Sequence, residues 1–284
     1  MVEDSTASQR LNRGQQVYAI KTWRYLRLAM VALVIGLAIS IAYEYFSTHP
    51  NCFRESISAY YYTPVHNFFV AVLMSVGVCL FCLKGSTELE DTLLNLAGML
   101  APVVALVPNT PDDKCYSEVV AVKNLAAIEN NVTALIAVGG FGLVVLAVLA
   151  IWSGPSRTEA IGYGVAALVV GIAAGVFWGG DRDVFVEHAH YWAAIPMFVF
   201  IIAVVCINAV AYRPKPARSP RNPYSAIGVA MVACVPLAVL AKRLGWDHTV
   251  LALEGALIVL FAAFWFIQTV ELWHEGLRET AGTQ

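Results

Sequence analysis

The chain has 284 residues, of which 59% are hydrophobic and 13% are charged, and its net charge is −2. A soluble domain has about 25% charged residues, so half that share indicates side chains that face lipid or other helices. The slightly negative net charge excludes a nucleic-acid-binding role that depends on a basic surface. These values predict a membrane protein whose natural partner is lipid.

Long apolar runs recur along the whole chain. A membrane-spanning helix needs about 20 mostly apolar residues, and a helix pairs its own backbone amides, as lipid requires. We therefore predict an all-α, polytopic transmembrane bundle over residues 27–272, with tails at 1–26 and 273–284. Eight helices are predicted, at 27–47, 65–83, 92–108, 132–152, 161–180, 192–212, 225–242 and 249–272. The segments 92–108 and 225–242 are the weakest, because they are short and contain proline.

The positions of positive charges predict the orientation. Lys and Arg concentrate in the cytoplasmic segments of membrane proteins. With the N-terminus inside, twelve of the 18 Lys and Arg residues fall on the cytoplasmic side and six on the other. Eight crossings then place both termini in the cytoplasm, in a multi-pass protein of the cell membrane.

Two of the six cysteines, Cys52 and Cys115, fall in predicted outer loops, whereas the other four lie inside predicted helices. Cysteines on an oxidising face of a membrane readily form disulfides. We expect a Cys52–Cys115 bridge between the loops; the alternative is two unpaired thiols.

Residues 51–69, NCFRESISAYYYTPVHNFF, are too polar to span lipid and unusually rich in aromatic residues. We predict that they lie at the outer membrane surface and lead into the second helix. The side chains predicted to line an outer pocket are Ser56, Tyr60, Tyr61, Tyr62, Asn67 and Gln268. The alternative for the aromatic residues is an interfacial belt.

Histidines and acids also gather on the predicted outer side. The segment DRDVFVEHAHYW (181–192) contains several of them, and two more histidines open the second and eighth helices. Imidazole and carboxylate groups suit zinc, and a catalytic zinc site needs about three protein ligands. The candidate ligands are His66, Asp183, His188, His190 and His248. Two alternatives remain: these side chains cap helix ends and pair with nearby basic residues, or they serve a pH-linked role.

Glu254 lies about five residues inside the eighth predicted helix. An acid in a spanning helix is costly and usually faces the bundle interior. It is either an acid/base beside a pocket or a hydrogen-bonded acid that locks two segments together. Gln268, fourteen residues later, projects from nearly the same helix face.

Glycine recurs every four residues in the fifth predicted helix, at Gly171, Gly175 and Gly179. Small residues at this spacing let a neighbouring backbone approach closely, so we predict a close helix contact along this stripe.

Four short stretches resemble the DUF998-like membrane proteins and their Frag1/DRAM/Sfk1 relatives: SISAYYYTPVHNFF (56–69), NLAGMLAPVVALVPNTPDD (95–113), HYWAAIPMF (190–198) and FWFIQTVELW (264–273). The residues that carry the resemblance are Ile57, Ser58, Pro64, His190 and either Glu254 or Glu271. Ala59 stands where these families have an aspartate, and they have about six helices. The resemblance implies a lipid-related role.

The outer histidines and Ser58 also resemble the zinc site of alkaline-ceramidase-like membrane hydrolases, although this sequence has no His-x-x-x-His pair. The leading interpretation is therefore a membrane protein that binds or senses lipid in an outer pocket. The first alternative is a metal-dependent hydrolase of a lipid amide or ester, with zinc held by histidines and Glu254 and Ser58 as catalytic candidates. The second alternative is a small-solute transporter.

Overall fold

The computed structural model describes residues 2–47, 53–109, 125–180, 182–212 and 222–278, with side chains from residue 17 onward. Over these residues the chain is all-α, which confirms the predicted helical bundle. The elements are α1 (Val2–Ser47), η1 (Ser58–Tyr62), α2 (His66–Cys82), α3 (Glu88–Leu106), α4 (Leu125–Ser153), α5 (Arg157–Gly179), α6 (Arg182–Ala211), α7 (Pro223–Arg243) and α8 (Thr249–Glu271). The predicted tail 1–26 is helical from residue 2 and continues into the first spanning segment.

Seven helices in the described part of the chain are long and apolar enough to cross a membrane. The two segments expected to be weakest, now α3 and α7, are among them. The shortest apolar helix is instead α2, with 17 residues. At about 1.5 Å per residue α2 covers roughly 26 Å, slightly less than a hydrocarbon core of about 30 Å.

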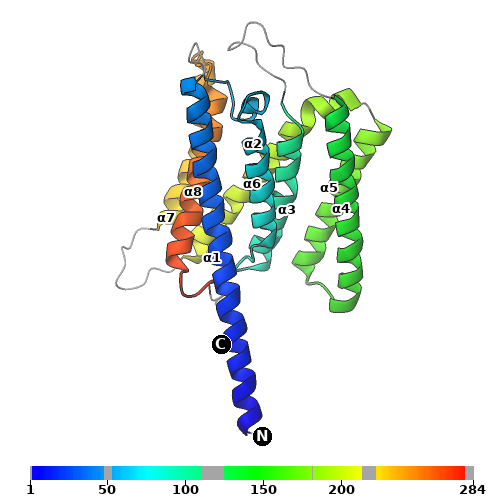
Figure 1. Cartoon of the computed structure of the whole chain (residues 1–284), viewed down its shortest axis with the longest axis vertical. Coiled ribbons are helices and arrows are strands. Elements are labelled where there is room, and N and C mark those ends of the chain that lie inside the picture. Colours follow the sequence, from blue (N-terminus) through cyan, green and yellow to red (C-terminus); the bar gives the residue numbers. More distant parts are fainter. Residues whose placement is uncertain (1, 48–52, 110–124, 181, 213–221, 279–284) are drawn as a thin grey trace.

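The helices run side by side, and α1 extends well beyond the others (Figure 1). The start of α1 and the end of α8 point to the same end of the bundle, whereas η1 lies at the opposite end. We call these the Arg278 end and the η1 end. Side chains cap several helix starts: Thr87, Ser156 and Asn222 accept hydrogen bonds from the first-turn amides of α3, α5 and α7.

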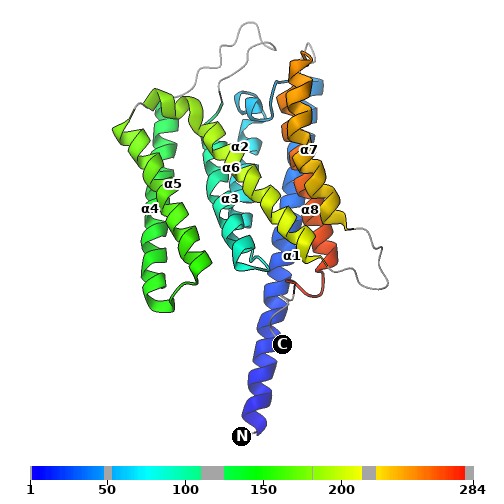
Figure 2. The same cartoon turned by 180° about the vertical axis from the view of Figure 1, so that it is seen from behind.

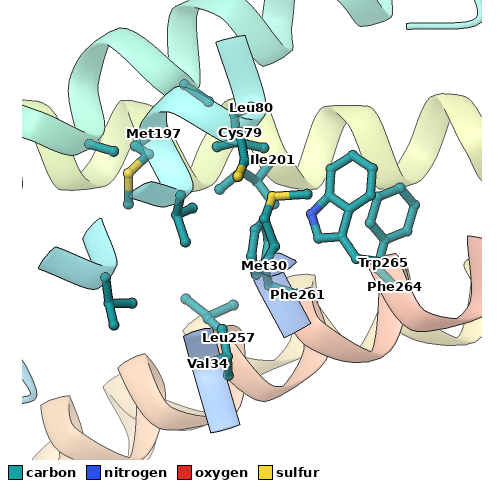
Figure 3. Packing of buried hydrophobic residues seen from close by; sticks show 14 of the residues in the cluster. Met30, Val34, Cys79, Leu80, Met197, Ile201, Leu257, Phe261, Phe264 and Trp265 are labelled. Carbon is teal, nitrogen blue, oxygen red and sulfur yellow. The ribbon is translucent and has the colours of Figure 1, made fainter. Parts of the chain in front are cut away.

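Two hydrophobic clusters hold the bundle together, and α6 belongs to both. The larger cluster joins α1, α2, α3, α7, α8 and the second half of α6; residues such as Met30, Met197, Phe261 and Trp265 meet in it (Figure 3). The smaller cluster joins α4, α5, the end of α3 and the first half of α6. Figure 2 shows α6 crossing obliquely from the α4–α5 pair to α7 and α8.

The α4–α5 pair exposes large apolar side chains on its outer faces. The most apolar stretch of α4 contains no buried residue, and Phe141, Ile151 and Trp152 are among its most exposed side chains. In water such a surface would be an aggregation site. In a bilayer it is the ordinary lipid-facing surface of a spanning helix.

Close helix packing occurs at a different pair of glycines from the one predicted. A Cβ on Gly98 would lie 2.7 Å from the Gly77 carbonyl oxygen, and one on Gly77 would lie 2.9 Å from the Gly98 carbonyl oxygen. The backbones of α2 and α3 therefore touch at these residues. The predicted contact along Gly171, Gly175 and Gly179 was wrong, because a Cβ on any of them would meet nothing within 4 Å.

Candidate functional site

A cavity of about 80 Å³ lies near the η1 end, between η1 and helices α1, α2, α3, α6 and α8. Its lining residues are apolar except for Ser58 in η1, Glu254, which bonds to the segment before η1, and His190. Three of the residues selected from the sequence therefore converge on one cavity, although they come from η1, α6 and α8.

Glu254 links the segment before η1 to the start of α8 through hydrogen bonds. Its carboxylate oxygen Oε2 accepts a hydrogen bond from the Ile57 amide at 2.6 Å, and the Ser58 amide also donates to the carboxylate. One turn earlier, the Leu251 amide donates to the Glu55 carbonyl at 2.8 Å. Both roles considered for Glu254 meet here, because the carboxylate locks two segments together and also lines the cavity.

The serines and tyrosines of residues 56–62 are arranged in two groups. Ser56 and Ser58 are buried, and their hydroxyl oxygens lie 3.0 Å apart. The Tyr60 side chain is only 1% exposed. Tyr61 and Tyr62 are half-buried, and the Tyr62 hydroxyl donates to the Asn109 carbonyl at 2.8 Å. Burial raises the pKa of both hydroxyls, so they stay neutral donors at physiological pH.

None of the six predicted pocket residues is among those that line this cavity, and two of them lie well away from it. Asn67 is exposed on the first turn of α2. Gln268 lies fourteen residues along α8, where its amide donates to Asn208 Oδ1 at 2.8 Å. Glu254 and Gln268 share a face of α8 but lie at different depths in the bundle, because fourteen residues span about 21 Å of helix.

His190 is held in one tautomer by α3. Its Nδ1 atom lies 2.9 Å from the Val107 carbonyl oxygen, and the side chain is 2% exposed. A carbonyl oxygen only accepts, so Nδ1 carries the hydrogen in this contact. His188 is exposed and stacks on Trp192, with ring centroids 5.6 Å apart. Residues two apart on a helix point in nearly opposite directions, which separates the two histidines.

The other predicted metal ligands are also dispersed. His66 Nδ1 contacts the Tyr61 carbonyl oxygen at 2.7 Å, His248 precedes α8 beside Phe53, and Asp183 is exposed in the first turn of α6. Among the residues that the structure describes, no three His, Cys, Asp or Glu side chains come together to hold a metal ion. The predicted five-residue zinc set is therefore not assembled. Cys52 and Cys115, the predicted disulfide, lie outside the described residues.

A second cavity, of about 270 Å³, lies between α3, α4, α5 and α6 and is lined by apolar residues alone. The two cavities flank the contact between α3 and α6. Val104 and Ala194 line the first, whereas their neighbours Val103 and Ala193 line the second. The second cavity borders the lipid-facing α4–α5 pair.

A buried polar network at the Arg278 end was not predicted from the sequence. The Asn208 amide donates to Glu90 Oε1 at 2.7 Å, and both residues are almost completely buried. Arg278, Glu271 and Tyr224 join this network from three other segments. Asn208 could have been noticed as a polar residue in the apolar run 192–212, but its partners could not.

The fold and cavities define the class: a multi-pass membrane protein built as a helical bundle, with one cavity lined in part by Ser58, His190 and Glu254 and a second lined by apolar residues. A scan against protein-family models and searches of curated proteins and of solved structures find no match to this chain. A function must therefore be argued from the cavities themselves.

Proposed function

We propose that this protein binds a membrane lipid at the η1 end, with the lipid's polar group beside Ser58, His190 and Glu254. The observation that carries this proposal is that Ser58, His190 and Glu254 line the otherwise apolar 80 Å³ cavity. Such a wall matches an amphiphile whose chain runs towards the middle of the bundle. The positive-charge distribution supports an outward-facing η1 end.

The residues at the η1 end of this cavity favour a ligand that donates hydrogen bonds. The Glu254 carboxyl group accepts hydrogen bonds from the Ile57 and Ser58 amides, and its oxygens can accept a further one from a ligand. The Ser58 hydroxyl can donate or accept. A lipid with a hydroxyl or an amide N–H next to its chain therefore fits this end better than one with only phosphate or ester oxygens there.

A cavity-filling substitution tests the proposal. Ala194 lines the cavity on α6, so Ala194→Phe is expected to occupy the space of the chain and weaken lipid binding at least about tenfold, or about 1.4 kcal/mol. The measurement is native mass spectrometry of the detergent-purified protein with its bound lipid. The matched control is Val199→Phe on the same helix, where the side chain is 55% exposed.

The control should keep the lipid of the unmodified chain. Equal lipid occupancy in Ala194→Phe and Val199→Phe would contradict the proposal. Because overpacking costs about 1–3 kcal/mol, thermal unfolding of both variants should be recorded, so that loss of lipid is separated from loss of fold.

Hydrolysis of a lipid ester or amide is the second candidate, because Ser58, His190 and Glu254 line one cavity. The serine hydroxyl contacts Ser56, and a nucleophile needs a base within hydrogen-bond reach. A hydrolysis assay separates the candidates: release of fatty acid from a lipid ester or amide that is lost in Ser58→Ala and kept in His188→Ala would favour the hydrolase.

A further inference from the structure

The Arg278 side chain lies in a set of partners that matches the shape of a guanidinium group. Its Nη2 atom lies 2.5 Å and its Nε atom 3.3 Å from the two oxygens of Glu271. Its Nη1 atom donates to Asn208 Oδ1, and its central carbon lies 4.8 Å from the centroid of the Tyr224 ring. A guanidinium group can bond to both oxygens of a carboxylate, donate to an amide oxygen and stack on an aromatic face at the same time. A lysine ammonium cannot make these three contacts together.

The partners of Arg278 are themselves fixed, so the site does not depend on Arg278 for its shape. The Tyr224 hydroxyl donates to Glu271. Asn208 is held by its bond to Glu90, which also accepts from the Ser86 amide at 2.8 Å. Gln268 donates to Asn208, and its own Oε1 is buried without a partner in the described part of the chain. A free acceptor remains next to the network.

The segment that carries Arg278 packs beneath the bundle through a few contacts. Arg27 donates to the Gly276 carbonyl at 2.9 Å, and Arg24 donates to the Trp273 carbonyl at 2.5 Å and lies over that ring. Gly276 has a positive φ of 75° and packs against Ile20 and Trp23. The Arg278 amide also donates to the Ser86 hydroxyl, before α3, at 3.3 Å. These contacts reach α1 and the segment before α3, so residues 272–278 can leave without unfolding α6, α7 or α8.

We propose that the Arg278 end contains a guanidinium-binding site, formed by Asn208, Tyr224 and Glu271, which Arg278 occupies as a built-in ligand. Residues 272–278 then act as a plug. When the plug is withdrawn, the site takes a small molecule or a peptide side chain that bears a guanidinium group. The buried carboxylates of Glu90 and Glu271 supply the attraction, because without Arg278 their charge is incompletely compensated.

Chemical rescue tests this proposal on the full chain. Arg278→Ala is expected to lower the Tm of the detergent-purified protein by about 5–10 °C, because it leaves a buried carboxylate without its partner. Low-millimolar guanidinium chloride should restore at least half of that loss, whereas methylammonium chloride or sodium chloride at equal ionic strength should not. The matched control is Arg243→Ala, an exposed residue at the end of α7, whose Tm should respond to none of the salts.

A Tm of Arg278→Ala equal to that of the unmodified chain, or equal recovery with all three salts, would overturn the proposal. If Arg278→Ala does not fold, hydrogen exchange of residues 272–278 in Glu271→Gln replaces it. Loss of the ion pair between Arg278 and residue 271 should release the plug and speed hydrogen exchange at least about tenfold relative to the unmodified chain. Unchanged exchange would overturn the proposal as well.

Discussion

Gly98→Val is expected to lower the free energy of unfolding by about 3 kcal/mol and to reduce the yield of monodisperse protein. A side chain on Gly98 would lie 2.7 Å from the Gly77 carbonyl oxygen and 3.0 Å from the Phe81 amide nitrogen. Both are backbone atoms, so the collision cannot be relieved by a rotamer change, and α2 must move away from α3. Thermal unfolding in detergent and size-exclusion chromatography would measure the effect.

The matched control is Gly140→Val in α4, where an added Cβ meets nothing within 4 Å. Both substitutions replace a helical glycine with the same residue, so the difference between them isolates the close contact. We expect a change of less than about 0.5 kcal/mol for Gly140→Val. Equal losses in the two variants would show that the α2–α3 contact is not what limits stability.

Asn208→Leu is expected to cost about 3–5 kcal/mol, because it removes the residue to which three polar side chains are bonded. Asn208 donates to Glu90 at 2.7 Å, accepts from Gln268 at 2.8 Å and also accepts from Arg278. Leucine has a similar size, so the loss reflects stranded polar groups rather than a cavity. Thermal unfolding of the detergent-purified variant is the measurement.

Asn95→Leu in α3 is the control, since Asn95 is half-buried and lines a small pocket with α4 and α5. Its effect should stay within about 1 kcal/mol. The interpretation fails if Asn208→Leu unfolds at the same temperature as Asn95→Leu, because the network would then contribute nothing to stability.

The architecture could be predicted from the sequence because lipid imposes a single simple requirement. Each spanning segment must be apolar over about 20 residues, and that property belongs to the segment alone. All eight predicted segments overlap the helices found here. Helix starts were harder: the run 92–108 was predicted from its apolar residues, so Glu90, in the first turn of α3, was left outside the predicted helix.

Contacts between segments were predicted less well, because they depend on neighbours that a single sequence does not identify. The glycines of α5 have the spacing of a packing stripe, yet no helix backbone reaches them, whereas isolated glycines in α2 and α3 meet. His188 and His190 are neighbours in the sequence, but the turn of α6 sends one outward and the other towards Val107. Ser58, His190 and Glu254 line one cavity although they come from three separate elements, whereas none of the six side chains predicted to line a pocket is among its lining residues.

The oblique course of α6 has a mechanical consequence. Helix α6 joins the lipid-facing α4–α5 pair to the larger cluster. A change in the tilt of that pair must therefore either rotate α6 or bend it. Pro196 lies near the junction of the two halves of α6. Proline removes one intrahelical hydrogen bond there and makes the helix easier to bend. Ala193 and Ala194 sit one turn away and face the two cavities. A thinner or thicker bilayer that changes the tilt of α4 and α5 would therefore also move the α6 residues that line the Glu254 cavity and change its shape.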